Sequence, residues 1–297
     1  MKYNKYSIFL KIVECGSLRK AAELTNYSQS AVSQALSSLE DELGIKLLNR
    51  THSSLSLTAE GEQLIPYIRK ICNDDQELME KIDQLLDLQT GLIRIGTFSS
   101  ISCHILAPAL HKFKQKYPKI TFDLKQGDYK EIESWLNDNI VDIGIVHLPT
   151  RKDFEPICVF KHKMMAVLPK DHHLANKKTV PLSLYAEEPF ILIQEGVDKV
   201  ILKKFREENI KPNIAYVSED DYTIMSMVEN DLGISILAEL VLQKNTYDIL
   251  VKDISPRFYR EIGLAINKDH QPSIATNIFI EFFKDYLKKN EIPGVTV

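Results

Sequence analysis

Residues 17–50 read SLRKAAELTNYSQSAVSQALSSLEDELGIKLLNR, and this stretch decides the fold of the N-terminal part of the chain. Ser28 is suited to cap a helix, and Ser17 is suited to cap a shorter helix before it. Asn26 lies between them and tolerates a left-handed turn. The second helix has one apolar face, formed by Val32, Leu36, Leu39 and Leu43. Two helices joined by so short a turn predict a helix-turn-helix.

A wing and a long helix are expected to follow this motif. Residues 54–57 alternate polar and apolar side chains, which predicts a strand after the second helix. From Thr58 to residue 88 one helical pattern continues, with an apolar stripe at heptad spacing: Leu64, Ile68, Ile71, Leu78, Ile82 and Leu85. We interpret this stripe as a dimerising coiled coil. The alternative is an amphipathic helix packed on its own domain.

After a hinge at 89–91, apolar strand patterns alternate with helical patterns. We expect helices over 101–117, 129–138, 197–209, 220–231 and 273–290, and strands over 92–97, 120–126, 141–146, 164–168, 190–194, 214–217, 233–237 and 262–266. Such alternation predicts parallel sheets covered by helices. The fold class is therefore α/β, with an N-terminal all-α winged helix-turn-helix, a long linker helix and a C-terminal α/β region large enough for two lobes.

Composition excludes several classes of protein. The chain has 297 residues, 44% hydrophobic and 26% charged, which is ordinary for a globular protein. Its four cysteines form no CxxC pair, so no zinc ribbon or disulfide framework is expected. No apolar run approaches the roughly 20 residues that span a bilayer, and the start of the chain lacks a signal-peptide pattern. We expect a cytoplasmic protein with reduced thiols and no membrane contact.

The net charge of −4 is unevenly distributed. Residues 1–58 hold 7 Lys and Arg against 5 Asp and Glu, a net charge of +2. Residues 59–88 hold 3 against 8, a net charge of −5. The N-terminal block is thus the one part with a positive balance, and it is only weakly positive, so the total charge of the chain does not argue against a polyanion as its partner.

The exposed face of the helix after Ser28 is polar and uncharged. Glutamine amides can read adenine in the major groove, and serine hydroxyls can reach bases or phosphates. Basic and polar residues of the wing would meet the phosphate backbone. The expected DNA-binding residues are Ser17, Ser28, Gln29, Ser30, Ser33, Gln34, Ser37, Arg50, His52 and Ser53. The alternative is a helical domain that binds another protein.

These residues resemble the N-terminal signature of LysR-type transcriptional regulators. The match covers residues 17–50 and continues in LSLTAEGEQL at 55–64, with the spacing intact. Segments 92–97, 107–118, 142–145 and 228–237 resemble the effector region of that family, so the resemblance extends over nearly the whole chain. It implies a periplasmic-binding-protein-like effector domain, homodimers or homotetramers on double-stranded operator DNA, and control by a small-molecule effector.

The domain division that we expect follows from this resemblance and the patterns above. It has a DNA-binding domain over 1–58, a dimerising linker helix over 59–88 and a regulatory domain over 92–297. Lobe one would comprise 92–161 and 266–297, and lobe two 162–265. The resemblance also admits RNA polymerase as a partner. One position departs from the family, because Gln34 stands where a basic residue is common, which argues against a guanine-reading arginine.

The effector pocket is expected where strands end and helices begin. Hydroxyl groups after the strand over 92–97 and polar groups at other strand ends could contact a ligand. The expected residues are Thr97, Ser99, Ser100, Ile101, Ser102, His147, Gln194 and Ser218. No arginine lies in these segments, so an anionic effector is not signalled. Residues 219–221 are acidic and could favour a cationic effector, but an aspartate in the first turn of a helix is more often a cap.

Three other functions are weighed against this one. Cys103 could sense oxidants at the start of a helix, although no neighbouring cysteine offers a resolving thiol. A cytoplasmic small-molecule binding protein without regulation would lack the N-terminal signature. An enzyme would need a catalytic constellation, and none of the common motifs is present. His162, His172 and His173 fit no zinc spacing. We expect no metal, no cofactor other than the effector, and no catalysis.

Overall fold

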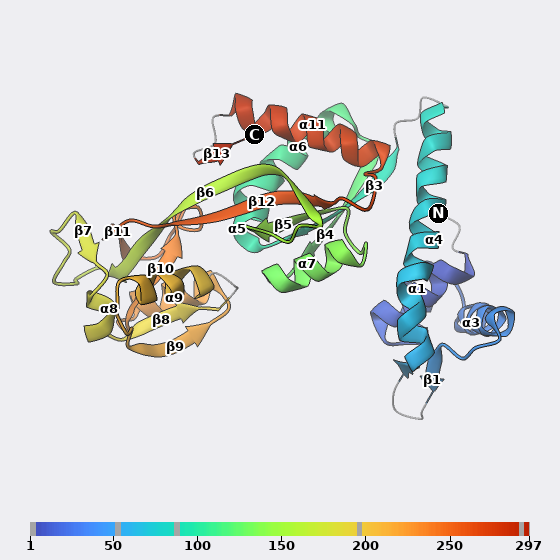
Figure 1. Cartoon of the computed structure of the whole chain (residues 1–297), viewed down its shortest axis with the longest axis horizontal. Helices are drawn as coiled ribbons and strands as arrows, with labels where there is room; N and C mark the ends of the chain where they lie inside the picture. The colour runs from blue at the N-terminus through green and yellow to red at the C-terminus, as the bar shows by residue number, and fades with distance from the viewer. Residues whose placement is uncertain (1–3, 51–54, 86–89, 195–197, 291–293, 297) are drawn as a thin grey trace. The chain divides into compact units, whose positions relative to one another are not determined.

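The computed structural model describes residues 4–50, 55–85, 90–194, 198–290 and 294–296 (Figure 1). The chain forms two compact units, Met1–Thr90 with Asn137–Ile140, and Gly91–Leu136 with Val141–Val297. Each unit has its own apolar core and is described separately. Among the described helices, none combines the length and the apolar character that crossing a membrane requires.

Three short helices begin the N-terminal unit: α1 (Lys5–Cys15), α2 (Leu18–Thr25) and α3 (Gln29–Leu43). Each begins at a residue whose side chain accepts a backbone N–H, namely Asn4, Ser17 and Ser28. Each ends at a left-handed residue, namely Gly16, Asn26 and Gly44. The predicted caps and turn are confirmed. The three helices enclose an apolar core that contains Phe9, Ile12, Val32, Leu36 and Leu39.

The wing and the linker helix complete this unit. Strands β1 (Leu48–Arg50) and β2 (Leu55–Leu57) pair antiparallel, and α4 runs over Ala59–Leu85. Thr58 accepts the N–H of Gly61 and donates its hydroxyl proton to the carbonyl of Lys46. A Cβ atom at Gly61 would lie 2.3 Å from the carbonyl oxygen of Leu47. Glycine at this position therefore lets α4 begin directly against the chain that enters the wing.

One mixed sheet runs through the second unit. Its strands lie in the order β4, β3, β5, β12, β6, β10, β8, β9. Their bounds are β3 Gly91–Thr97, β4 Ile120–Gln126, β5 Ile143–His147, β6 Phe154–Pro169, β8 Phe190–Ile193, β9 Ile214–Ser218, β10 Ile234–Ala238 and β12 Tyr259–Asn267. Further strands are β7 (Thr179–Pro181), β11 (Ile249–Ser255) and β13 (Val295–Thr296).

Strand β6 joins the two halves of this sheet. Residues 154–163 pair with β12, and residues 164–169 pair with β10 and β11. The sequence pattern predicted only the second part, over 164–168, as a strand. The first part was missed because it alternates buried and exposed side chains irregularly. The predicted lobe boundary near residue 162 lies where β6 changes partners.

Helices cover both faces of the first half of the sheet (Figure 1). Helix α7 (Tyr129–Asn137) packs on one face, where Gly96 and Gly144 lie under Ile132. Helices α6 (Ala107–Lys116) and α11 (Ile274–Lys289) cover the other face, where Phe113 and Phe279 stack edge to face at 5.3 Å. The second half carries α8 (Leu184–Glu187), α9 (Asp198–Glu207) and α10 (Asp221–Glu229). Helix α8 and strands β7, β11 and β13 were not predicted.

The helix predicted over 101–117 is interrupted. It consists of α5 (Ser99–Ile101), a π-helical turn η1 (Ser102–Leu106) and α6. The N–H of Ala107 donates to the carbonyl of Ser102, five residues earlier. Pro108 follows and has no N–H to continue an α-helical ladder. The wider turn therefore lies where the proline prevents regular bonding, directly beside the serines that we expect in the pocket.

Candidate DNA-binding face and effector cleft

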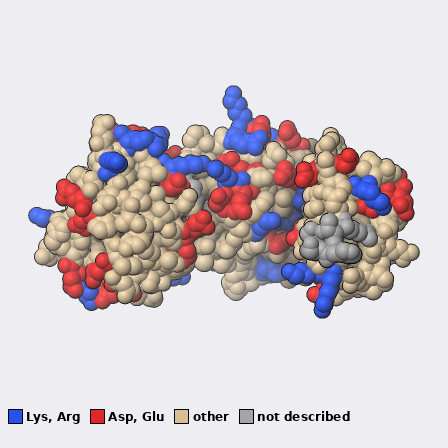
Figure 2. Space-filling view, turned by 90° about the horizontal axis from the view of Figure 1, so that it is seen from below, with Lys and Arg blue, Asp and Glu red and all other residues tan. Residues whose placement is uncertain are grey.

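Helix α3 presents its polar face away from the domain core. Gln29, Ser30 and Gln34 are exposed, and Ser33 and Ser37 are half-buried. Because Val32, Leu36 and Leu39 are fully buried on the opposite face, this surface is free to meet a partner. On the face that Figure 2 presents, acidic and basic side chains are interspersed, so charge alone marks no site there.

Two of the predicted DNA-binding serines, Ser17 and Ser28, accept hydrogen bonds within the protein. Ser17 accepts the N–H of Lys20 at 3.4 Å, and Ser28 accepts the N–H of Ala31 at 3.1 Å. The hydroxyl groups of Ser28 and Ser30 lie 2.9 Å apart. These contacts show helix capping, and a DNA contact would be a second role. Arg50 ends β1, but its side chain lies outside the description, as do His52 and Ser53.

The buried carboxylate of Glu40 holds the start of the wing. It accepts the N–H groups of Leu47 at 2.9 Å and Leu48 at 3.3 Å, and it pairs with the Lys46 ammonium at 2.8 Å. Burial alone would raise the pKa of Glu40, but these hydrogen bonds and the Lys46 charge outweigh it, and the pKa is lowered. This role of Glu40 was not predicted from the sequence. The signal was an acidic residue directly after Leu39 on the apolar face.

The heptad stripe of α4 divides into two parts. Ile68 is buried and Leu64 is half-buried, and both pack against the core of the N-terminal unit. Ile71, Leu78 and Ile82 are 44%, 58% and 40% exposed. The side chain of Leu85 lies outside the description, as do residues 86–88. An apolar stripe of this size on an exposed helix indicates a contact surface along residues 71–82.

A cavity of about 450 Å³ opens between the two halves of the mixed sheet in the second unit, which we call the effector sheet. It brings together Phe98 and Ser99 after β3 and Gln194 after β8. Its other lining residues were not among those predicted to contact an effector. The remaining lining residues are Gln126, Gly127, Asp128, Glu131 and Glu219. Two of the predicted effector residues, Ser99 and Gln194, thus line one cavity although they are far apart in the sequence.

The other predicted effector residues lie around this cavity without lining it. Thr97 and Ser102 are buried, and their hydroxyl groups are 3.1 Å apart. Ile101 is fully buried, and Ser218 accepts the N–H of Asp220 at 3.2 Å. Asp220 itself caps α10 by accepting the N–H of Thr223, which confirms capping as the explanation for this acidic residue.

Arg260 and His162 form a buried polar centre behind Phe98. They are direct partners across β12 and β6, so their side chains project from the same face of the sheet. Arg260 is 3% exposed, its guanidinium carbon lies 5.3 Å from the Phe98 ring centroid, and its Nη2 lies 3.4 Å from the Ser100 hydroxyl. No arginine lies in the segments that were expected to form the pocket, but the sheet brings Arg260, from another segment, to Ser100.

The position of Arg260 in the sequence could have indicated this centre. Arg260 shares a period-two face with the buried Ile262 and Leu264, and a charged residue at such a position is unusual. The tertiary pairing brings it to Ser100, 160 positions earlier in the chain. A sheet register was needed to see that contact.

Burial controls the ionisation of the groups around Arg260. It lowers the pKa of His162 to about 3, and the Arg260 charge lowers it further. It raises the pKa of Asp221, at the start of α10, to about 6, against the opposing effect of Arg260. It also lowers the pKa of His147, with Lys199 and Arg260 acting in the same direction. His162 is thus neutral at physiological pH and adds no second positive charge beside Arg260.

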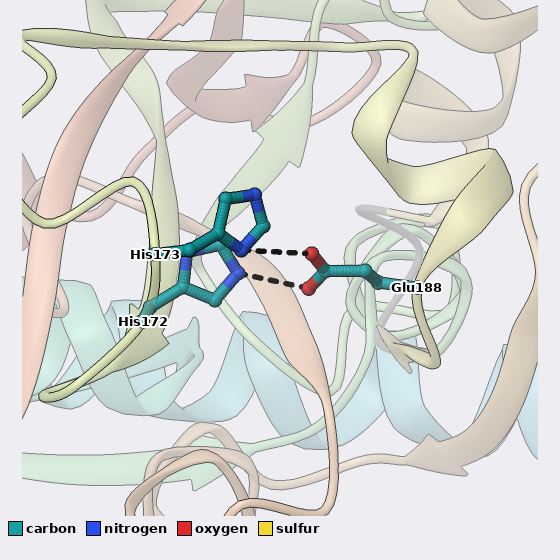
Figure 3. Close-up of side chains that lie close together, drawn as sticks. All are labelled: His172, His173 and Glu188. Atoms are coloured by element: carbon teal, nitrogen blue, oxygen red, sulfur yellow. Dashed lines mark hydrogen bonds and ion pairs between the residues drawn. The ribbon is translucent and has the colours of Figure 1, made fainter.

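A second cluster joins His172 and His173 to Glu188 (Figure 3). Nε2 of His172 lies 2.9 Å from a Glu188 oxygen, and Nδ1 of His173 lies 3.7 Å from the other. The N–H of Leu174 donates to Nδ1 of His172, so in the neutral ring the proton is on Nε2 and points to Glu188. In this arrangement His172 offers no free lone pair to a metal ion, and the contact is a hydrogen bond between loop and helix end.

Cys103 is exposed in the π-helical turn, whereas Cys158 is buried, and burial raises its pKa to about 12. A thiol with so high a pKa is a poor nucleophile, so Cys158 is unsuited to resolve an oxidised Cys103.

Comparisons with known proteins agree with these two regions. Residues 3–62 match the bacterial regulatory helix-turn-helix protein model of the lysR family, and residues 87–288 match the LysR substrate binding domain model. The uncharacterized HTH-type transcriptional regulator YvbU of Bacillus subtilis (strain 168) is 33% identical over 292 residues, which cover 96% of this chain and 98% of that protein.

Solved structures share the fold. The effector binding domain of QuiR in complex with shikimate is 28% identical with a TM-score of 0.62, and covers 67% of this chain and 98% of that one. A full-length OxyR from Pseudomonas aeruginosa is 21% identical with a TM-score of 0.73, and covers 97% and 95%. With a DNA-binding helix-turn-helix followed by an effector-binding domain, the chain belongs to the LysR family of transcriptional regulators.

Proposed function

We propose that this regulator binds operator DNA as a homodimer or homotetramer and is switched by a small molecule in the cavity between the two halves of its effector sheet. The exposed polar face of α3, opposite a fully buried apolar face, is the observation that carries the DNA-binding half. In this proposal the chain is a cytoplasmic regulator without catalytic turnover, and RNA polymerase is a further partner.

The domain division that we propose has residues 1–58 for DNA, 59–88 for dimerisation and 92–297 for the effector. Lobe one comprises 92–161 with 266–297, and lobe two comprises 162–265. Effector binding would shift the balance between two arrangements of lobes or subunits and so change the spacing of the half-sites that a dimer can reach.

Within α3 we assign base readout to Gln34 and to Gln29, whose amides are exposed. Serines 30, 33 and 37 would support them, with Ser28 and the wing residues Arg50, His52 and Ser53 facing phosphates. Because none of these α3 side chains is charged, we expect phosphate contacts and DNA shape to contribute much of the affinity.

Binding across a library of operator variants tests this assignment. Gln34→Ala should change the base preference, whereas Arg50→Ala should weaken binding to all variants and reduce the salt dependence. His111→Gln, an exposed change on α6, is the control. An unchanged base preference in Gln34→Ala would show that Gln34 does not read bases, and no operator binding at any salt would refute the DNA-binding proposal.

We propose that two chains associate through Ile71, Leu78 and Ile82, while Leu64 and Ile68 hold α4 to its own domain. Ile71→Asp combined with Leu78→Asp should shift the sedimenting species to a smaller one. Glu77→Gln, at an exposed position of α4 away from the stripe, should leave the mass unchanged. If both variants sediment as the parent does, another surface holds the dimer.

A further inference from the structure

Arg260 is a buried charge that no carboxylate of the described residues contacts directly, although the carboxyl group of Asp221, at the start of α10, acts on it from a greater distance. The side chain of Arg260 is 3% exposed, and among the described residues it forms no ion pair. Its Nε has no hydrogen-bond partner there, and Nη2 reaches only the Ser100 hydroxyl, at 3.4 Å. A buried guanidinium is costly unless an anion satisfies it. The surroundings of Arg260 therefore suit a group that brings negative charge from outside the chain.

His162 extends this unsatisfied centre. It is 5% exposed, and within the described part of the chain neither of its ring nitrogens has a hydrogen-bond partner. As the cross-strand partner of Arg260 it lies on the same face of the sheet. A neutral imidazole has one donor and one acceptor, so His162 can hydrogen-bond a ligand without adding charge. Two adjacent buried side chains thus point to the same missing group.

The neighbouring cavity has the opposite character. Among the described residues, three carboxylates line it, from Asp128, Glu131 and Glu219, and no lysine or arginine does. Asp128 and Glu131 accept each other's backbone N–H groups at 2.8 and 2.9 Å, which leaves lone pairs on each carboxylate. Arg260, Ser100 and His162 do not line this cavity, and the side chain that the two regions share is Phe98, which lines the cavity and whose ring centroid lies 5.3 Å from the Arg260 guanidinium carbon.

From this separation of charge we propose that the effector is a zwitterion of the amino-acid class. Its carboxylate would contact Arg260, Ser100 and His162, and its ammonium group would lie among Asp128, Glu131 and Glu219. The proposal rests on the proposed function, since it names the ligand class of the same cleft. A ligand with both charges satisfies the buried guanidinium and the acidic cavity together, whereas a simple acid or amine satisfies only one.

The test measures the melting temperature of the full chain with each of the twenty proteinogenic L-amino acids. For any that binds, the matched acid without the amino group and the matched amine without the carboxylate are measured at the same concentration. We expect at least one amino acid to raise the melting temperature and both matched compounds to fail. An equal shift with the matched acid, or no shift with any amino acid, would overturn the proposal.

Variants separate a ligand role from a structural one. Arg260→Met should reduce the affinity for the amino acid about a hundredfold while leaving the ligand-free melting temperature unchanged or higher, because an uncompensated charge is removed. Glu219→Gln should reduce it about fivefold, as expected for a charge at the rim. A lower ligand-free melting temperature in Arg260→Met would show that Arg260 stabilises the fold. In that case Arg260→Lys, which retains the positive charge, is measured as well, and it should still bind the amino acid measurably.

The same samples distinguish this proposal from the one on which it rests. If a simple acid binds the cleft and changes operator affinity, only the zwitterion proposal fails. If the chain binds its operator but no compound that binds the cleft changes that affinity, the switching proposal fails. A bound amino acid that also changes operator affinity supports both.

Discussion

Glu40 in the N-terminal unit and Arg260 in the effector unit are both only 3% exposed, yet their surroundings differ. Glu40 accepts two backbone N–H groups and an ammonium from its own chain. Arg260 has one long contact with a hydroxyl, and its cross-strand neighbour His162 has none. A buried charge that is fully satisfied stabilises a fold, whereas one that is left unsatisfied is a candidate for ligand binding.

The difference follows from what each unit must do. The N-terminal unit presents a rigid polar surface, so its buried polar groups are satisfied internally by caps and by Glu40. The effector unit must respond to a molecule that is not always present, so a polar centre that the ligand completes gives the ligand its differential affinity. Three changes test this comparison.

The largest effect is expected at Glu40. Glu40→Ala leaves the N–H groups of Leu47 and Leu48 buried without an acceptor, and should destabilise the N-terminal unit by about 3 kcal/mol. Urea unfolding followed by circular dichroism measures this. Lys46→Ala, at a side chain that is 71% exposed, should cost less than about 1 kcal/mol. Equal losses in the two variants would mean that the ion pair, and not the backbone contacts, holds the wing.

His162 should produce a smaller, pH-dependent effect. Its pKa is lowered by burial from 6.5 to about 3, so the folded chain keeps it neutral while the unfolded chain protonates it. The neutral state of His162 therefore costs the fold no stability above pH 6.5. As the pH falls from 6.5 toward 3, protonation of the unfolded chain lowers the free energy of unfolding. Between pH 7 and pH 5 we expect a loss of about 1 to 2 kcal/mol.

Replacing this histidine should remove that part of the pH dependence. Unfolding of His162→Gln at pH 7 and pH 5 should show a smaller difference than unfolding of the parent chain. His111→Gln, which removes an exposed histidine, serves as the matched control and should keep the parent difference. If both variants keep the parent difference between pH 7 and pH 5, the titration of another group causes the loss of stability.

The smallest effect distinguishes two neighbouring serines of the N-terminal unit. Ser28→Ala removes the cap of α3 and should destabilise by about 1 kcal/mol. Ser30→Ala leaves the cap in place and should change stability by less than about 0.5 kcal/mol while weakening operator binding. Thermal unfolding and operator titration of both variants measure this. A stability loss in Ser30→Ala equal to that in Ser28→Ala would show that the Ser28–Ser30 contact is part of the cap.

Much of the N-terminal unit could be predicted because its contacts are local. Ser17, Asn26, Ser28 and Gly44 act within four residues of their own positions, and the apolar face of α3 repeats with the helical period. The division of the α4 stripe could not be predicted, because Ile68 and Ile71 have the same pattern. Only the position of α4 on its domain buries one and exposes the other.

The effector cleft likewise has some features that the sequence predicts and others that it does not. The family, the alternation of strands and helices, and the serines after β3 could be predicted from the amino-acid sequence, because they depend on residues close together in the chain. The tertiary structure alone decided that β6 runs through both halves of the sheet, that Arg260 lies against Ser100, and that Asp128, Glu131 and Glu219 share one cavity. Their meeting depends on strand register and on which face each strand turns inward, and both are properties of the packed sheet.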